Sequence, residues 1–347
     1  MTRRIPIHIP DGYLSPVTCG TMYVVSAPFW YVAVQRVRKV LTHRTVPALA
    51  LFSAFTFILM MFNIPLPGGT TGHAVGGTLV AIILGPWAAV LSVSVVLAIQ
   101  ALLFGDGGLT TFGANCFNMA VVLPMVGYFI YKVISGNSDI NSARRLAGTI
   151  VGSYFGIIAA ALVAGLELGL QPLLFHAADG TPLYAPYSLN IAIPAMAIGH
   201  LAIAGPAEAI VTGLVFFYLQ KSHSAFLSRQ ASQKDEGKLW FVWAGALVVL
   251  AFATPLGLLA SGTAWAEWGA NELKEILGYI PQGLGRMSGI WHAPLPDYTI
   301  PTIGNIAGYI LSALIGIAVV GFLLWMLGRW ISRKKRIKQN PTSTGVS

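Results

Sequence analysis

The sequence predicts an all-α, polytopic transmembrane helical bundle of about nine membrane helices. Composition is the first reason, because 55% of the 347 residues are hydrophobic, 10% are charged and the mean hydropathy is +0.71. Soluble proteins carry charge on roughly a quarter of their residues. The second reason is a series of apolar runs near the length of about 20 residues that crosses a bilayer. Low charge and only two cysteines exclude a disordered chain, a coiled coil and a small disulfide scaffold.

The membrane helices follow from the apolar runs in order. A long run over 73–104 exceeds one span and is broken by Gly85 and Pro86, so it predicts a short helix and a second helix joined by a tight turn. The other runs predict helices at 18–37, 46–64, 112–131, 146–170, 189–219, 239–260 and 306–327. Polar residues then divide the chain into a seven-helix domain (1–220), a cytoplasmic linker (221–238) and a two-helix accessory region with an extracytoplasmic loop and a basic tail (239–347).

The basic residues predict the orientation. Nine helices put the termini on opposite sides, and with the N-terminus outside and the C-terminus inside, 17 of the 21 basic residues fall in inside loops or in the inside tail. This asymmetry supports the helix count, although the loss of two helices together would preserve it. The positive net charge therefore indicates membrane topology and not nucleic-acid binding. Residues 1–16 lack the hydrophobic core of a signal peptide, so we expect the first helix to be retained.

Two histidines on the predicted outer face are candidate metal ligands. His8 lies in a proline-rich segment before the first helix, and His73 follows a glycine-rich segment and begins the third helix. The two imidazoles can converge at one outward-opening site, and imidazole nitrogen is a preferred ligand of nickel, cobalt, copper and zinc. Two alternatives stay open: a boundary histidine often only hydrogen-bonds there, and the glycines around His73 are typical of packed membrane helices. We expect His176 and His292 to be solvated loop residues.

Four further polar residues are candidates for orienting the metal or lining its pathway. Glu208 lies inside the seventh predicted helix, where an ionised carboxylate is costly, so it either has a function or fixes helix packing by hydrogen bonding. Asn115 and Asn118 share one face of the fifth helix, from which they orient the N-terminal segment or hold helices together. Asp11 marks the turn of that segment.

Several motifs follow one another along the first two thirds of the chain. They are HIPDGYLSP (8–16), GGTTGHAVGG (68–77), LGPWAA (84–89), QALLFGDGGLT (100–110), GAN with FNMA (113–120) and the segment 205–213. In this order they resemble the CbiM/NikM family, the substrate-capture (S) components of energy-coupling-factor (ECF) transporters for cobalt and nickel. Residues 239–330, with the motifs LLASGTAW and PLPDY, resemble the two-helix partner protein of these systems (CbiN/NikN-like), fused through the polar linker.

The resemblance implies a metal site built from nitrogen ligands at the N-terminus. These ligands are the amine of the first residue, the next backbone amide, the imidazole of a histidine at position two and the imidazole of one further histidine. On this sequence the two histidines are His8 and His73. Four nitrogens in a plane suit Ni(II) and hold Co(II) with less preference. Six residues precede Ile7, which stands where the family has its initiating methionine. The amine ligand is then lost or loops back, unless the extension is removed or the true start is Ile7.

The resemblance also implies a function and partners. The function is ATP-driven import of Co(II) or Ni(II) across a bacterial or archaeal plasma (inner) membrane, with a slight preference for cobalt for cobalamin biosynthesis. The ion is the transported substrate, and no permanently bound cofactor is implied. The chain has no Walker phosphate loop, so we expect a transporter component and not an enzyme, with ATP hydrolysis in cytoplasmic ATPase subunits and a transmembrane coupling (T) subunit as partners. Two alternatives remain: an ion-gradient-driven secondary transporter with Glu208 as proton carrier, and a membrane scaffold subunit without a metal site.

Overall fold

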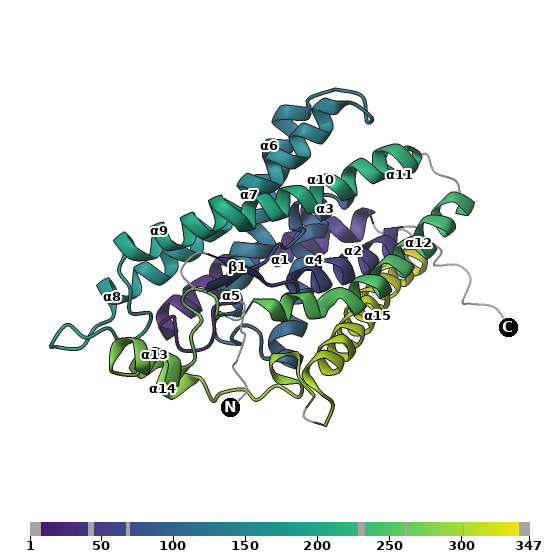
Figure 1. Cartoon of the computed structure of the whole chain (residues 1–347). Helices are drawn as coiled ribbons and strands as arrows, with labels where there is room; N and C mark the ends of the chain where they lie inside the picture. Colours follow the sequence, from purple (N-terminus) through teal and green to yellow (C-terminus); the bar gives the residue numbers. More distant parts are fainter. Residues whose placement is uncertain are drawn as a thin grey trace.

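A computed structural model describes residues 8–40, 45–66, 70–227, 233–260, 262–300 and 302–339. The described chain is mostly helical, which confirms the predicted fold class (Figure 1). Within it, seven helical stretches are long and apolar enough to cross a membrane, which makes the protein a multi-pass membrane protein. These stretches are Pro16–Lys39, Pro86–Phe104, Phe112–Ser135, Ala143–Leu174, Leu189–Ser222, Trp240–Leu259 and Asn305–Arg329.

The first third of the chain contains a turn that the sequence predicts and a hairpin that it does not. Its elements are α1 (Pro16–Val40), α2 (Thr45–Met60), β1 (Ile64–Leu66), β2 (Thr70–Gly72), α3 (Gly77–Leu84) and α4 (Pro86–Ile99), with β1 and β2 antiparallel. Gly85 has a φ of 99° and Pro86 opens α4, so the chain turns where predicted. With 16 and 8 residues, α2 and α3 are shorter than a regular bilayer-spanning helix, so the count of nine crossings stays a prediction.

The structure corrects the predicted start of the third helix. The sequence places His73 at that start, but α3 begins at Gly77 and His73 lies in an irregular segment after β2. Gly76 has a φ of 75°, which a right-handed helix does not accommodate. The carboxylate of Glu208 accepts hydrogen bonds from the N–H groups of Val75 and Gly76, so these groups are satisfied without a helical turn. A long-range contact decides this boundary, and the hydrophobic pattern carries no sign of it.

The rest of the chain alternates long helices with short π-helical or 3₁₀ segments. Its elements are η1 (Gln100–Phe104), α5 (Phe112–Asn115), η2 (Cys116–Val122), α6 (Leu123–Ser135), α7 (Ala143–Gly169), α8 (Gln171–Leu174), α9 (Leu189–Gly199), η3 (His200–Ala204), α10 (Gly205–Ser222), α11 (Ser224–Leu227), α12 (Gln233–Ala253), η4 (Thr254–Leu259), α13 (Ala270–Leu277), α14 (Gln282–Met287), η5 (Pro296–Tyr298) and α15 (Asn305–Gln339). The segments η1, η2 and η3 are π-helical, a geometry that often marks functional sites. Before Glu208, η3 ends at Ala204 and α10 begins with Gly205 and Pro206, and proline cannot donate a backbone hydrogen bond.

Close backbone packing holds α7 against its neighbours α6, α9 and α10 (Figure 1). A Cβ atom on Gly152 of α7 would lie 2.5 Å from the carbonyl oxygen of Gly127 on α6, and one on Gly156 would lie 2.7 Å from the carbonyl oxygen of Leu123. Lipid offers helices no hydrophobic reason to associate, so small residues that let backbones approach are the usual basis of such contacts. These helices form a rigid support for the residues that they carry toward the candidate site.

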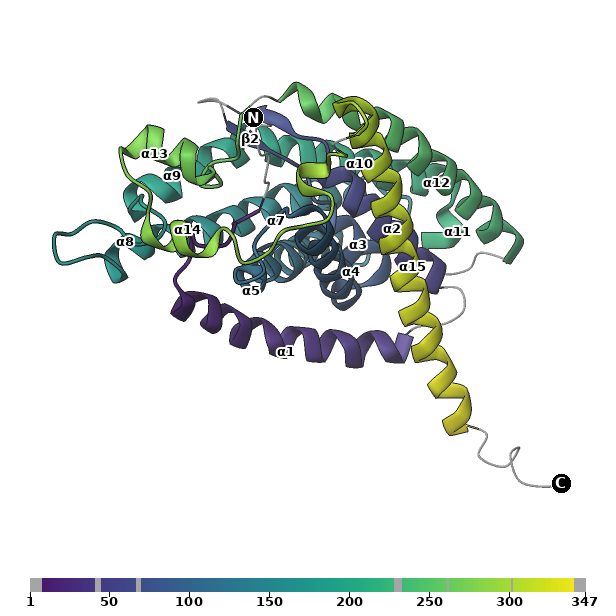
Figure 2. The same ribbon diagram turned by 90° about the horizontal axis from the view of Figure 1, so that it is seen from below.

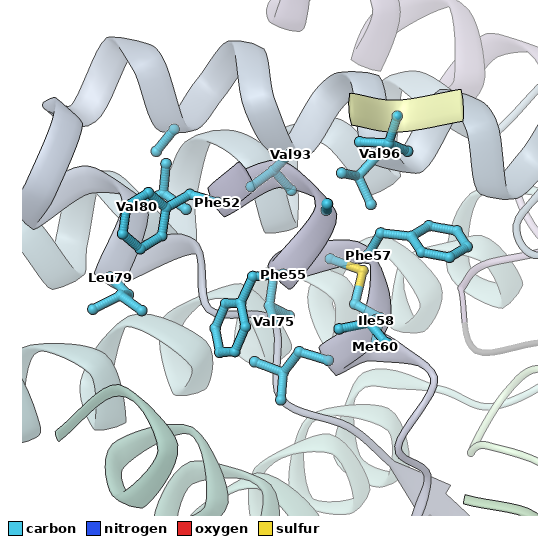
Figure 3. Packing of buried hydrophobic residues seen from close by; sticks show 14 of the residues in the cluster. Phe52, Phe55, Phe57, Ile58, Met60, Val75, Leu79, Val80, Val93 and Val96 are labelled. Carbon is cyan, nitrogen blue, oxygen red and sulfur yellow. The ribbon is translucent and has the colours of Figure 1, made fainter. Parts of the chain in front are cut away.

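The two C-terminal helices pack on α2, whose apolar side chains form the main core together with α3 and α4. Figure 3 shows this cluster, with Phe52, Phe55, Phe57, Ile58, Met60, Val75, Leu79, Val80, Val93 and Val96. Both α12 and α15 contact α2, and Figure 2 shows α15 crossing beside it. At the crossing Gly316 meets the ring of Phe57 so closely that an added Cβ would lie 1.9 Å from the ring. The C-terminal region is therefore built into the bundle and is not a loose appendage.

The loops at one end of the bundle are joined by hydrogen bonds between distant parts of the chain. In Figure 1 the short helices α8, α13 and α14 gather at this end. Ala185 N–H donates to the carbonyl of Tyr13 (2.9 Å), and Gly283 N–H donates to that of Leu183 (2.8 Å). The residues before α1, the loop after α8 and the loop between η4 and α15 thus form one continuous layer. The candidate site lies beneath it.

Candidate metal site

The segment before α1 is fixed by hydrogen bonds to the loop after η1 and to α5. Asn115 binds Ile9 twice: its Oδ1 accepts from the Ile9 N–H and its Nδ2 donates to the Ile9 carbonyl, both at 3.1 Å. The Asp11 carboxylate accepts from two consecutive backbone N–H groups, the second belonging to Thr110, at 3.1 and 2.7 Å. Only 2% of His8 is exposed as a result. Asp11 and Asn115, both predicted candidates, therefore orient the segment that carries His8.

The segment between β2 and α3 positions the second histidine. The Nδ1 atom of His73 lies 3.1 Å from the carbonyl oxygen of Ala74. With its proton on Nδ1, the ring donates to this carbonyl and carries its lone pair on Nε2. The fully buried carboxylate of Glu208 accepts from the N–H of Val75 (2.7 Å) and of Gly76 (2.9 Å). The predicted candidate Glu208 thus holds the segment next to His73.

The two predicted histidines come together in the structure. The ring centroids of His8 and His73 are 5.3 Å apart, and the rings meet edge to face at 82°. Both side chains are buried, at 2% and 8% exposure. The convergence expected from the sequence is therefore present, although the two residues come from separate segments of the chain. Their role as metal ligands stays a prediction.

Asp106 is a site residue that the sequence analysis missed. Its Oδ1 lies 3.1 Å from Nδ1 of His8, with about 1% of either side chain exposed. A carboxylate at this nitrogen favours the tautomer with the proton on Nδ1, which puts the lone pair on Nε2. Among the described residues Nε2 of His8 has no hydrogen-bond partner, as a ligand nitrogen requires. The sequence signal is an aspartate between Gly105 and Gly107, directly after a membrane helix on the predicted outer face.

The C-terminal region binds the second oxygen of the Asp106 carboxylate, the one that does not face His8. Tyr298 donates a 2.7 Å hydrogen bond to Oδ2 of Asp106 and accepts one of 3.1 Å from Gln100. Burial and the neighbouring carboxylate raise the pKa of Tyr298, so its hydroxyl stays protonated and remains a donor. The backbone of the same loop is tied down nearby, because Leu295 N–H donates to the carbonyl of Leu103 (2.9 Å). His8 and the C-terminal region are thus linked through one carboxylate.

His8 and His73 line a cavity of about 510 Å³. Its walls are largely apolar, and Asn115, Asn118 and His200 add polar groups from α5, η2 and η3. The C-terminal region closes one wall with residues 264–268, which include two tryptophans and the carboxylate of Glu267. Burial raises the pKa of Glu267, and the negative charge of Asp106 raises it further. The cavity is therefore lined by both halves of the chain.

The second predicted asparagine does not contact the N-terminal segment. Asn118 donates a 2.8 Å hydrogen bond to the buried carboxylate of Glu167 on α7. One turn further along, Gln171 accepts from the N–H of Ser15 at 2.9 Å and donates to the carbonyl of Glu167 at 2.8 Å. Asn118 therefore joins η2 to α7, which matches the helix-joining alternative, while Gln171 does the orienting. Neither Glu167 nor Gln171 was predicted, because an isolated polar residue in an apolar helix does not reveal its partner.

Part of the ligand set implied by the family lies outside the described residues. The terminal amine and Ile7 belong to residues 1–7. Within the described ranges there is no group of three or more His, Cys, Asp and Glu side chains arranged to hold a metal ion. The two imidazoles can supply two nitrogen ligands, and a complete coordination sphere needs further donors. His176 and His292 are exposed in the loops, as expected.

The chain matches two families in succession. Residues 8–226 match CbiM, described as the cobalt uptake substrate-specific transmembrane region, and residues 239–333 match the PDGLE domain. The first match contains both histidines, Asp106 and Glu208, and the second contains Glu267 and Tyr298. Both confirm the resemblance that the sequence motifs indicate.

Full-length relatives and solved structures agree with this assignment. The chain is 48% identical over 332 residues to the fused nickel transport protein NikMN of Rhodobacter capsulatus, which covers 90% of this chain and 95% of that protein. It is 47% identical over 331 residues to the probable fused nickel transport protein LarMN of Lactiplantibacillus plantarum, covering 93% and 97%. A crystal structure of a truncated transition metal transporter is 54% identical and superimposes with a TM-score of 0.59 over 62% of this chain and all of that one. The chain belongs to the CbiM family of cobalt uptake substrate-specific transmembrane proteins, with a PDGLE domain following the transmembrane region.

Proposed function

We propose that this protein captures Ni(II) or Co(II) at its outer face for import, with His8 and His73 as ligands. One observation carries the proposal: two buried imidazoles from separate segments meet at 5.3 Å between centroids in a cavity, each with an acceptor near Nδ1. With the protons on Nδ1, which these acceptors favour, the lone pairs of the rings are on Nε2, the form of imidazole that binds transition metals. Nitrogen ligands favour such ions over Mg²⁺ and Ca²⁺, which prefer oxygen.

Full-length relatives favour nickel. Three relatives that match both parts of the chain are named for nickel transport, whereas shorter matches to the first part include proteins named for cobalt. A tetragonal set of nitrogen ligands also suits Ni(II) better than Co(II). Ni(II) is therefore the preferred substrate in this proposal, in place of the slight preference for cobalt that the sequence analysis expects.

The proposed mechanism of import uses partners. We place the His8 and His73 end outside the cell, because basic residues concentrate in the loops assigned to the inside of the plasma membrane. A transmembrane coupling subunit and cytoplasmic ATPase subunits would bind the inner surface and drive reorientation of the S component, residues 1–220. The accessory region, 239–347, joined through the linker 221–238, acts with it as one fused component. The fused relatives named for nickel transport support this division.

The proposal is tested by metal binding and uptake with matched histidine variants. Purified protein in nanodiscs is titrated with NiCl₂ by calorimetry, and ⁶³Ni uptake is measured in cells with and without the ATPase subunits. His8→Ala and His73→Ala should each lower Ni(II) affinity by about a hundredfold or more, since each removes a ligand. His176→Ala and His292→Ala make the same change at exposed positions and should leave binding unaltered.

The same experiment separates the alternatives. A secondary transporter would keep importing Ni(II) without ATPase subunits and stop when an uncoupler is added. A scaffold subunit without a metal site would show equal binding for the wild type and all four histidine variants. Mass spectrometry of the mature N-terminus decides whether the chain begins at Ile7 or retains the residues before it, and so whether a terminal amine lies next to His8.

A further inference from the structure

A buried carboxylate from the C-terminal region faces the same cavity as the two histidines. Glu267 lies in the loop between η4 and α13, is 8% exposed and lines the cavity together with His8 and His73. Its Oε2 is fully buried and has no hydrogen-bond partner among the described residues. A buried carboxyl oxygen without a donor destabilises the protein unless a cation or a donor reaches it.

The loop around Glu267 is anchored where it stands. The N–H of Glu267 donates to the carbonyl of Ala264 at 3.1 Å, and the carbonyl of Trp268 accepts a 2.7 Å hydrogen bond from the hydroxyl of Tyr13. Ala266 is 1% exposed and has a φ of 65°, a conformation that is unfavourable for alanine. Glu267 thus follows a residue with a strained backbone, and the hydrogen bond from Tyr13 ties its loop to the segment that carries His8.

Two carboxyl groups lie close to the cavity, Glu267 in its wall and Asp106 beside His8. Burial, and then the negative charge of Asp106, raise the pKa of Glu267 and so disfavour its ionised form. Two carboxylates in a buried region repel each other, and two unit negative charges balance one divalent ion. A cation at the histidines would therefore favour the ionised form of Glu267 and offset its repulsion with Asp106.

We propose that Glu267 faces the divalent cation held by His8 and His73, so that the PDGLE region contributes a negative charge to the binding site. This inference rests on the proposed function and adds a residue from the second half of the chain to the site. It assigns the accessory loop a direct part in cation affinity. Ni(II) bound at neutral imidazoles keeps its full charge, and a carboxylate in a buried, largely apolar cavity stabilises that charge more than one in bulk water.

The test compares charge removal inside and outside the cavity in the full-length protein. Glu267→Gln keeps the side-chain shape and removes the charge, whereas Glu267→Asp keeps the charge. Glu275→Gln, on α13 of the same loop, makes the same charge change at an exposed position. NiCl₂ binding is followed by calorimetry and by quenching of Trp265 and Trp268, both of which line the cavity. Glu267→Gln should raise the Kd by roughly tenfold or more, while Glu275→Gln should leave it within about twofold and Glu267→Asp should retain most of the affinity.

Thermal unfolding supplies a readout that a merely structural residue would not give. At neutral pH and above, Glu267→Gln should raise the Tm of the metal-free protein, because the wild type must there keep the buried carboxyl protonated or ionise it without a partner, and it should reduce the increase in Tm that NiCl₂ causes. The inference is overturned if Glu267→Gln binds Ni(II) as tightly as the wild type, or if it lowers the metal-free Tm along with affinity. If wild type and His8→Ala bind Ni(II) equally, the proposed function itself fails. If only the histidine variants lose binding, the proposed function stands and the role of Glu267 does not.

Discussion

Tyr298 and Asp106 form a 2.7 Å hydrogen bond between the two halves of the chain, 192 residues apart in sequence. Asp106 in turn lies 3.1 Å from His8. The C-terminal region therefore holds the carboxylate that orients one of the proposed ligands, and truncating this region would disturb the site even if every residue before it stayed in place.

Removing the Tyr298 hydroxyl should weaken metal binding. Tyr298→Phe leaves one oxygen of Asp106 without its donor, and loss of such an orienting contact costs roughly tenfold or more in metal affinity. Tyr309→Phe is the matched control, because its hydroxyl donates to the carbonyl of Met61 and not to Asp106. It should lower the Tm but keep the Kd for Ni(II). Equal affinities for Tyr298→Phe and the wild type would show that this hydrogen bond does not act on the site.

Neutralising Glu208 should reduce both stability and affinity. A glutamine can offer one oxygen to the N–H groups of Val75 and Gly76, and a hydrogen bond to a charged group contributes about 1.5–3 kcal/mol. We expect a lower Tm in nanodiscs and weaker Ni(II) binding by calorimetry, since the segment next to His73 is released. If Glu208 instead carries protons for a secondary transporter, Glu208→Gln should bind Ni(II) normally and abolish the sensitivity of uptake to an uncoupler.

Alanine substitutions of Asn115 and Asn118 should differ in their effect on amide hydrogen exchange in the segment before α1. Asn115→Ala breaks both hydrogen bonds to Ile9, so amide hydrogen exchange in the segment 8–15 should accelerate and Ni(II) affinity should fall roughly tenfold. Asn118→Ala loses its bond to Glu167 and should leave exchange in that segment unchanged. Comparable exchange in both variants would contradict the assignment of the orienting role to Asn115.

A single methyl group at the crossing of α15 and α2 should destabilise the protein. Gly316→Ala would place its Cβ 1.9 Å from the ring of Phe57, and overpacking of this kind costs about 1–3 kcal/mol. Gly321→Ala, five residues later on the same helix, meets no atom within 4 Å and should leave the Tm unchanged or slightly higher. Thermal unfolding of both variants decides whether the C-terminal helices are packed as described.

The stability of the metal-free protein should depend on Glu267 and pH. Burial, and then the charge of Asp106, raise the pKa of Glu267 above its usual value, so the folded state keeps this proton at a pH where the unfolded chain has lost it. The folded state binds more protons in that window, and stability falls as pH rises from the unfolded pKa of about 4.3 through the folded pKa. The Tm advantage of Glu267→Gln over the wild type should therefore grow as the pH rises from about 5 to about 8. An advantage that shrinks with rising pH would show that Glu267 is stabilised as an anion.

Periodicity and composition predict the helices but not the breaks that place the site. Each apolar run contains a helix, and the turn at Gly85 and Pro86 follows from local backbone preferences. The hairpin after α2 and the late start of α3 do not follow from local preferences. Glu208, on a helix more than a hundred residues away, accepts the backbone hydrogen bonds just before α3. Hydrogen bonds of that kind leave no trace in a hydrophobic pattern.

By itself, the sequence determined that this is a membrane protein and predicted two histidines on its outer face, and its motifs placed it in its family. The length of an apolar run and the ligand chemistry of a side chain depend on residue types alone, so they can be recognised without knowledge of tertiary contacts. Only the tertiary structure decided that His8 meets His73, that Asp106 lies beside His8, and that Glu267 and Tyr298 reach the same region from the C-terminal loop. Packing brings these residues together, and the free energy of a buried charge depends on its neighbours, which chain order does not reveal.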